Sequence, residues 1–151
     1  MSPRAACRLE TLGFQHVYDY VAGKMDWFAA GLPREGTEAA TDRVGDHARA
    51  DVPTAAPDED ADGLEARLGD WDVCVVVNDD RVVLGVATAD ALAAAAGRTV
   101  ANVMAEGPTT YRPHTSTDEV AKWMRNKGEA YVIVTDPGGH LLGVARREDL
   151  G

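Results

Sequence analysis

Two stretches of the chain share one sequence plan, and this plan decides the fold. Residues 73–92 read VCVVVNDDRVVLGVATADAL, and residues 131–150 read YVIVTDPGGHLLGVARREDL. They align without a gap when Val73 is placed on Tyr131, a spacing that we call the strand offset. An apolar, β-branched run, a polar turn and a second apolar run are typical of two antiparallel strands. Two short units of the same plan usually bury a face against each other, and the seam between them can hold a ligand.

The match extends upstream at a slightly different spacing. Residues 53–57 (PTAAP) match residues 109–113 (TTYRP), and the spacing from Pro53 to Thr109 is called the opening offset. It is shorter than the strand offset by two positions, so the second copy carries two extra residues between this short match and its strands. In that interval a helix is expected in each copy. It begins near residues 57–60 with Leu64 and Leu68 as its apolar edge, and near Thr117 in the second copy.

A third helix is expected after the return strand of the first copy. Thr88 or Asp90 can accept hydrogen bonds from the first free N–H groups of that helix, which the alanine-rich sequence extends to Ala96. The second copy stops at Gly151, where the same helix would continue.

Composition limits the classes of function. A chain of 151 residues suits one compact domain or two small ones, and its 45% hydrophobic and 26% charged residues are ordinary for a soluble protein. We expect a cytoplasmic protein, because no apolar run approaches membrane-spanning length. The net charge of −10 argues against nucleic-acid partners. The scattered histidines and cysteines lack metal-ligand spacing, so no metal is expected.

The region before the repeats shows weaker patterns. Residues 3–12 indicate a helix that ends at Gly13, residues 14–21 alternate like a strand, and residues 26–30 suggest a helical turn. Residues 37–50 are poor in large apolar side chains and are interpreted as a linker. The acidic run from Glu35 to Asp72 is interpreted as a solvated surface rather than an interaction surface.

Residues 51–151 resemble a tandem pair of cystathionine-β-synthase (CBS) domains, a Bateman module. The resemblance rests on residues 99–104 (TVANVM) leading into 108–110 (PTT), on the helix carrying residues 120–124, on the Asp-Pro-Gly-Gly turn and on Leu-Gly-Val at 142–144. It implies an α/β (α+β type) fold of two β-α-β-β-α units, at 51–103 and 104–151. The units would pack sheet to sheet as a pseudo-symmetric pair with two clefts at the seam.

The resemblance also implies a function. Many such pairs form disc-like homodimers, bind AMP, ADP, ATP or S-adenosylmethionine, and regulate an attached or partner protein. The ligand motif of the family is Gly, two residues, Thr or Ser, two residues, Asp. The hydroxyl favours phosphate near a helix N-terminus, and the carboxylate accepts hydrogen bonds from the ribose hydroxyls.

Each copy holds only part of this motif. The first copy has Gly85 and Thr88, but Ala91 replaces the acid, and Asp90 lies one residue early, a rotation of about 100° on a helix. The second copy has Gly143 and Asp149, but Arg146 replaces the hydroxyl residue. Arg146 or Arg147 could still attract phosphate. The second copy is therefore the favoured site, although Thr88 as a plain helix cap and Asp149 as a solvated acid remain alternatives.

The candidate nucleotide-binding residues that follow from this resemblance come from both copies. They are Asp149, Arg146, Arg147, Thr88, Asp90, Thr110 and Val132.

Residues 1–36 resemble the closing part of a rhodanese domain, a sulfurtransferase fold, with a helix-strand-helix order. The resemblance rests on residues 12–14 (LGF), 17–20 (VYDY), 23–27 (GKMDW) and 31–33 (GLP). In that family the persulfide cysteine lies on a loop before this helix, a position that falls ahead of residue 1. Cys7 does not match it, and a partly buried structural cysteine is the favoured interpretation of Cys7.

Three functions therefore stay open. The leading one is a non-enzymatic, homodimeric regulatory module that senses an adenosine-containing metabolite and requires no cofactor. The second is a dimerisation or scaffold module with degenerate sites, and the third is sulfur handling through Cys7. No catalytic residue is expected, because the chain has no Gly-x-Ser-x-Gly elbow, Walker loop or Gly-x-Gly-x-x-Gly fingerprint.

Overall fold

The two sequence copies form two small β-sheets. The computed structural model describes residues 3–18, 20–33, 35–36 and 40–151. In the first sheet, strand β1 (Thr54–Ala55) runs parallel to β2 (Val73–Val77), which pairs antiparallel with β3 (Val83–Thr88) and then β4 (Ala105–Glu106). In the second, β5 (Thr110–Tyr111) is parallel to β6 (Tyr131–Thr135), which pairs antiparallel with β7 (Leu141–Arg146). The predicted strands of both copies are confirmed.

The turns between the paired strands are built alike, as the strand offset predicts. The Oδ1 atom of Asn78 accepts a hydrogen bond from the Val82 N–H at 2.8 Å. The Oδ1 atom of Asp136 accepts the equivalent bond from the His140 N–H at 2.9 Å. Short polar side chains that bond the backbone ahead of them favour such turns.

The helices differ between the copies. The second copy has the predicted helix, α4 (Thr117–Lys127), which ends at Gly128 with a φ of 74°. In the first copy the helix expected from residue 57 is wrong: only one 3-10 turn, η3 (Leu64–Arg67), forms there. Gly63 and Gly69 flank it at φ values of 81° and 57°, so left-handed backbone breaks the helix at both ends.

The terminal helices also differ. Helix α3 (Ala89–Ala93) begins after Thr88, as predicted, but ends before the expected Ala96. Its equivalent in the second copy is a 3-10 turn, η5 (Arg147–Leu150).

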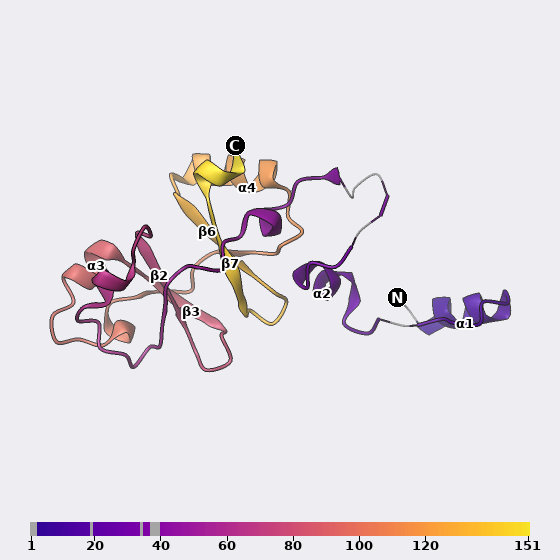
Figure 1. Cartoon of the computed structure of the whole chain (residues 1–151), viewed down its shortest axis with the longest axis horizontal. Coiled ribbons are helices and arrows are strands. Elements are labelled where there is room, and N and C mark those ends of the chain that lie inside the picture. The colour runs from indigo at the N-terminus through magenta and orange to yellow at the C-terminus, as the bar shows by residue number, and fades with distance from the viewer. Residues whose placement is uncertain (1–2, 19, 34, 37–39) are drawn as a thin grey trace.

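The sheets pack face to face through one apolar cluster. Val73, Val75 and Val86 of the first sheet meet Ile133 and Val144 of the second, all at most 8% exposed. Separate clusters lie under the helices of each copy. The expected sheet-to-sheet pair of CBS type is therefore confirmed (Figure 1).

A pseudo-two-fold axis relates the copies and passes between two matching hydrogen bonds. The Val83 N–H donates to the Gly139 carbonyl at 3.0 Å, and the Leu141 N–H donates to the Arg81 carbonyl at 2.9 Å. The strand offset relates Val83 to Leu141 and Arg81 to Gly139. Each bond is thus the symmetry mate of the other.

The interpretation of residues 37–50 as a linker is wrong for the part from residue 40 onward. Val44 is fully buried in the cluster beneath α4 and begins a 3-10 turn, η2 (Val44–His47). The Val44 N–H donates to the Thr115 carbonyl at 2.9 Å. The Val100 N–H, at the start of η4 (Val100–Asn102), donates to the Glu59 carbonyl at the same distance.

These residues are the first-copy counterpart of the segment that opens the second copy. The opening offset relates Val44 to Val100, and it also relates the two acceptor residues, Glu59 and Thr115. Each opening segment packs on the sheet of the other copy, because Arg49 pairs with Val144 on β7 just as Ala105 pairs with Val86 on β3. The first copy therefore begins near residue 43. Because each opening segment packs on the sheet of the other copy, we call these two segments the exchanged segments. Their contacts hold the two sheets together.

Asp42 fastens the exchanged segment to α4. Its carboxylate accepts a hydrogen bond from the Thr117 hydroxyl at 3.0 Å and lies 2.8 Å from the His47 ring. The bond with His47 is the main cause that holds the pKa of Asp42 below its ordinary value.

The N-terminal region forms two short helices. Helix α1 (Pro3–Thr11) and the glycine turn at Gly13 agree with the sequence, while α2 (Gly23–Ala29) begins before the expected residue 26. The strand predicted at 14–21 is wrong for its described residues, 14–18 and 20–21, which form no strand. An alternating segment needs a neighbouring edge to pair with, and these residues pair with none in the described part of the chain. Figure 1 shows α2 beside the second copy and α1 at the far end of the molecule.

Candidate functional site

A cleft beside Thr88 opens between the two sheets. It encloses about 270 Å³ and is lined by residues of both copies. Val86 and Thr88 come from β3, and Val132 and Ile133 come from β6. Trp123 of α4 adds an aromatic wall and is held by the Tyr111 ring, with centroids 5.6 Å apart. An apolar slot with few polar groups is typical of a small-molecule site.

Thr88 and Glu129 are the two polar lining residues of this Thr88 cleft that bear most directly on ligand binding. Thr88 caps α3, because its hydroxyl oxygen accepts a hydrogen bond from the Ala91 N–H at 3.3 Å. Glu129 supplies the only carboxylate among the described residues that line the cleft. Ala91 carries no acid, as the sequence indicated, so Glu129 is the group in the cleft that can accept hydrogen bonds from a sugar.

A buried tryptophan, Trp71, lies at the equivalent place in the second copy. The strand offset places Trp71 on Glu129, and its side chain, packed with Val52 and Val144, is only 6% exposed. The Arg146 guanidinium carbon lies 4.2 Å from the centre of its ring, and that of Arg49 lies 4.9 Å from it. These cation–π contacts hold two arginines on the indole, so the second copy has an aromatic ring where the Thr88 cleft has the Glu129 carboxylate.

Asp149 lines a separate, shallow pocket. That pocket encloses about 310 Å³ and is formed with residues 46–49 of the exchanged segment. Arg49 points its guanidinium at the Asp51 carboxylate, with Nη2 to Oδ2 at 2.6 Å. Arg146 does not line this pocket, so the structure does not bring the expected pair of Asp149 and Arg146 together there.

Arg146 and Arg147 instead line a larger cavity of about 550 Å³, which we call the axial cavity. Asp72 and Val73 line it together with Ala130 and Tyr131, their counterparts at the strand offset. The cavity therefore reaches the seam between the copies. Trp71, Val73 and Arg146, the counterparts of Glu129, Tyr131 and Thr88, also line it, so it overlaps the second-copy place that is equivalent to the Thr88 cleft. Tyr131 lines both the axial cavity and the Thr88 cleft. Burial raises the pKa of its phenol above the ordinary value, with the Glu129 charge adding to the effect.

Three further candidates have distinct places. Val132 lines the Thr88 cleft, and 2% of its surface is exposed. Thr110 lies on β5 opposite Ile133, next to the lining residue Thr109. Asp90 lies in the first turn of α3 and lines neither the Thr88 cleft, nor the axial cavity, nor the Asp149 pocket.

The two motif glycines have a packing role. A Cβ atom on Gly143 would lie 2.7 Å from the Arg49 carbonyl oxygen, and one on Gly85 would lie 2.8 Å from the Ala105 carbonyl oxygen. Both distances are too short for carbon and oxygen, so glycine is required where each exchanged segment crosses the opposite sheet. This explains the Leu-Gly-Val repeat without reference to a ligand.

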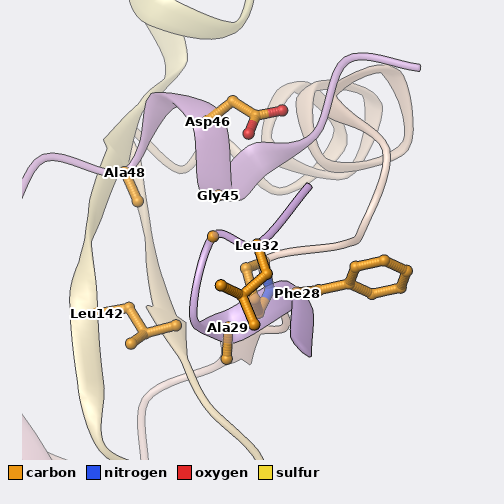
Figure 2. A pocket seen from close by; sticks show the side chains of 9 residues that line it. Phe28, Ala29, Leu32, Gly45, Asp46, Ala48 and Leu142 are labelled. Carbon is orange, nitrogen blue, oxygen red and sulfur yellow. The ribbon is translucent and has the colours of Figure 1, made fainter. Parts of the chain in front are cut away.

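A further cavity, of about 240 Å³, lies where α2 meets the second copy. In Figure 2, Ala29 and Leu32 face Leu142 and Ala48 across it, and the Phe28 ring points away. That ring lies 5.8 Å from the His114 ring, centre to centre. The cavity is an imperfect joint between the N-terminal region and the repeats.

Sequence reasoning missed Trp71, Glu129 and Tyr131. A signal was available for the first two, because they occupy equivalent positions in the two copies and differ completely in type. Among the described residues, no group of three or more His, Cys, Asp or Glu side chains could hold a metal ion. No helix in this described part of the chain is long and apolar enough to cross a membrane.

Comparisons with known proteins support the fold. Residues 100–150 match the CBS domain family. No curated protein sequence matches the chain. Among solved structures, the chain is similar to the cytosolic domain of the Mg²⁺ channel MgtE in complex with ATP, with a TM-score of 0.67 and 23% identity. The match covers 75% of this chain and 50% of that one, so the chain spans half the length of the MgtE domain.

Two smaller structures match over nearly their whole length. CBSX2 in complex with AMP, a CBS-pair protein from Arabidopsis thaliana, has a TM-score of 0.66 and 21% identity over 72% of this chain and 92% of that one. The CBS domain pair of MJ0100, in complex with 5′-methylthioadenosine and S-adenosylmethionine, has a TM-score of 0.62 and 20% identity over 73% and 93%. Residues 100–150 therefore match the CBS domain family, and the chain has the fold of a CBS-domain pair.

Proposed function

We propose that this chain is a non-enzymatic regulatory module that binds an adenosine-containing nucleotide in the Thr88 cleft. The observation that carries the proposal is the open, mostly apolar cleft between the two copies, with the Thr88 hydroxyl and one carboxylate, that of Glu129, among its lining groups. Similar CBS-pair structures hold AMP, ATP or S-adenosylmethionine. This choice differs from the sequence-based preference for the second copy, because Asp149 lines a separate pocket there and Arg146 is stacked on Trp71.

The roles of the lining residues follow from their chemistry. Val86 and Val132 offer apolar surface to the adenine ring, and Trp123 offers an aromatic one. The Thr88 hydroxyl can donate to the 5′ substituent while its oxygen still caps α3. Glu129 accepts hydrogen bonds from the ribose hydroxyls in place of the missing acid at Ala91.

Regulation follows from the position of the cleft. Its walls belong to both copies, so a bound ligand stabilises one packing of the two sheets over others, which is a population shift. The activity of the attached or partner protein would depend on which packing is populated. A homodimer and a cytoplasmic location, expected from the family resemblance and the composition, belong to the same proposal.

Calorimetric titration of the full chain with AMP, ATP and S-adenosylmethionine tests the site. Thr88→Val should weaken binding of the preferred ligand about tenfold, the loss of one hydrogen bond to a charged group. Thr99→Val is the matched control, because the Thr99 hydroxyl bonds Asn102 away from the cleft and should be silent. Glu129→Gln should weaken adenosine more than 2′,3′-dideoxyadenosine, which has no hydroxyls for the carboxylate.

The Asp149→Ala variant distinguishes ligand binding in the first copy from ligand binding in the second. The proposal expects affinity to stay within about twofold, since Asp149 lines a different pocket. A loss at Asp149→Ala with none at Thr88→Val would move the site to the second copy.

A second candidate function is a dimerisation or scaffold module with degenerate sites. The tryptophan at residue 71, which replaces the acid of the first cleft, and the alanine at residue 91 favour it. A dimer in sedimentation, with no thermal shift from any adenosine nucleotide at millimolar concentration, would establish this alternative.

Sulfur handling by the N-terminal region has the least support. Cys7 is an exposed free thiol, but the strand expected of a rhodanese-like fragment does not form among the described residues. Sulfur transfer from thiosulfate to cyanide that disappears in the Cys7→Ser variant would support this function.

A further inference from the structure

The exposed apolar surface of this protein is concentrated in its N-terminal region. In the described part of the chain, every large apolar side chain that is exposed lies between residues 12 and 32. The most exposed are Val21 at 91%, Tyr18 at 82%, Phe14 at 60% and Leu12 at 59%. We call residues 12–18 and 20–21 the apolar arm, and Figure 1 shows α1 and the residues that follow it away from both sheets. Large apolar side chains gathered on a surface are typical of a site that binds another protein.

The N-terminal region also differs from the repeats in charge. Residues 1–36 contain four basic and four acidic side chains, so the whole formal net charge of −10 comes from residues 37–151. Two copies of the chain that approach through their repeats repel each other, whereas their N-terminal regions can meet with no net charge on either side. A neutral apolar surface also has no charge with which to select a strongly acidic or basic partner. The charge distribution therefore favours contact between the N-terminal regions of two copies.

The chain exposes more surface than a compact monomer of its mass. Its accessible surface is 9193 Å². A compact monomer of 16.1 kDa would expose about 7,400 Å², so about 1,800 Å² is in excess. A standard interface between two proteins removes roughly 800 Å² from each partner. The excess is therefore large enough to supply an interface of this size.

Residues 14–18 (FQHVY) favour a second copy of the chain as the partner. They alternate, with Phe14, His16 and Tyr18 on one face of an extended segment and Gln15 and Val17 on the other. This pattern predicts a strand, yet residues 14–18 pair with no strand in the described part of the chain. An unpaired segment of this kind is a template for another chain. Two copies of one segment can pair antiparallel across a two-fold axis, which is the commonest symmetry of protein dimers.

We propose that the apolar arm binds the same arm of a second copy, with residues 14–18 of the two chains paired antiparallel about His16. The Phe14 N–H already donates to the Leu9 carbonyl at 3.2 Å, so the ladder forms through the backbone of Gln15 and Val17. Phe14 then lies opposite the partner's Tyr18, and such aromatic pairs stabilise antiparallel strands. This inference goes beyond the proposed function, because the arm contributes no residue to the Thr88 cleft.

Sedimentation velocity of the full chain at micromolar concentrations tests the dimer. Phe14→Asp and Tyr18→Asp should each raise the dimer dissociation constant about tenfold or more, because two symmetric aromatic pairs are lost. Gln15→Asp is the matched control, since it adds the same charge on the opposite face of the segment and should leave the constant within about twofold. All three side chains are exposed, so circular dichroism should show the parent fold in each variant.

A disulfide cross-link tests the pairing itself. Opposite residues that share no ladder hydrogen bonds have Cα atoms about 4.5 Å apart, a distance that a disulfide can span. In a Cys7→Ser background, His16→Cys should therefore give a disulfide-linked dimer on mild oxidation in air. Gln15→Cys is the matched control, because it lies diagonally across the ribbon from its own mate and should stay largely reduced. The remaining thiol, Cys74, is buried.

The outcomes separate this interface from the proposed function. A chain that stays monomeric throughout this concentration range overturns the interface and leaves the Thr88 site standing. A dimer that survives Tyr18→Asp also overturns it, since the contact then lies in the repeats. Equal cross-linking of His16→Cys and Gln15→Cys overturns the antiparallel pairing about His16.

Discussion

The two copies share a backbone plan but treat the space between their sheets differently. Beside β3 the cleft is open, with Thr88 and Glu129 on its wall. At the equivalent place beside β7, Trp71 is buried, two arginines cover its ring, and Trp71 and Arg146 line the larger axial cavity. The equivalent pairs Glu129 and Trp71, and Thr88 and Arg146, differ in size and charge. A pseudo-symmetric fold thus yields two cavities of different chemistry.

The largest expected effect on stability comes from removing the Trp71 indole. Trp71→Ala leaves a large hole in the cluster between the sheets, and we expect a loss of about 3–5 kcal/mol in the free energy of unfolding. Urea denaturation with a fitted midpoint and slope measures it. Trp123→Ala is the control, because Trp123 is half-buried on the wall of the open cleft and should cost less. Equal costs would show that Trp71 does not fill its space.

The exchanged opening segments offer a test of equivalence. Val44 and Val100 are both fully buried at corresponding positions. Val44→Ala and Val100→Ala should each lower the free energy of unfolding by about 2 kcal/mol, from lost apolar burial and the cavity left behind. A Val44 variant as stable as the parent would contradict the assignment of residues 43–49 to the repeat and restore a linker there.

The joint between the N-terminal region and the second copy should depend on pH. Burial, helped by the nearby Arg43 charge, lowers the pKa of His114 below its ordinary value. The folded state therefore favours the neutral ring. Its stabilising contribution is present above the unfolded pKa of about 6.5 and is lost as pH falls toward the folded value. Between pH 7.5 and 5.0, the melting temperature should fall less in His114→Gln than in the parent. Identical slopes would contradict this.

The smallest effect concerns the two thiols. Burial raises the pKa of Cys74 to about 11, while Cys7 is an exposed thiol on α1. A thiol reagent should modify one cysteine per native chain and two after unfolding, because only the thiolate reacts at an appreciable rate. Fast modification of both in the native protein would contradict the burial of β2.

The strands and turns could be predicted because the strand offset repeats them in both copies. Val73–Val77 and Tyr131–Thr135 are continuous apolar runs, a pattern that buried strands require. Residues 43–49 were missed because Val44 is their one strong apolar signal. The opening offset, extended back from Pro53, would have paired Val44 with Val100.

The site was harder to predict because it depends on side-chain packing across copies. Half-motifs at Thr88 and Asp149 pointed to both clefts, but no pattern shows that Trp71 is buried beside the second with two arginines on its ring. The contribution of Glu129 also comes from the opposite copy, at a long distance in sequence. Pairing each position with its counterpart at the strand offset would have exposed the contrast between Trp71 and Glu129.

Amide chemical-shift mapping during titration with S-adenosylmethionine tests the central claim most directly. If the Thr88 cleft is the nucleoside site, the largest changes should fall on residues 86–88 and 129–133, which line it from both copies. Thr88→Val should require about tenfold more ligand for the same changes. Changes centred on residues 46–49 and Asp149 would contradict the account, because they would place the nucleoside in the second copy.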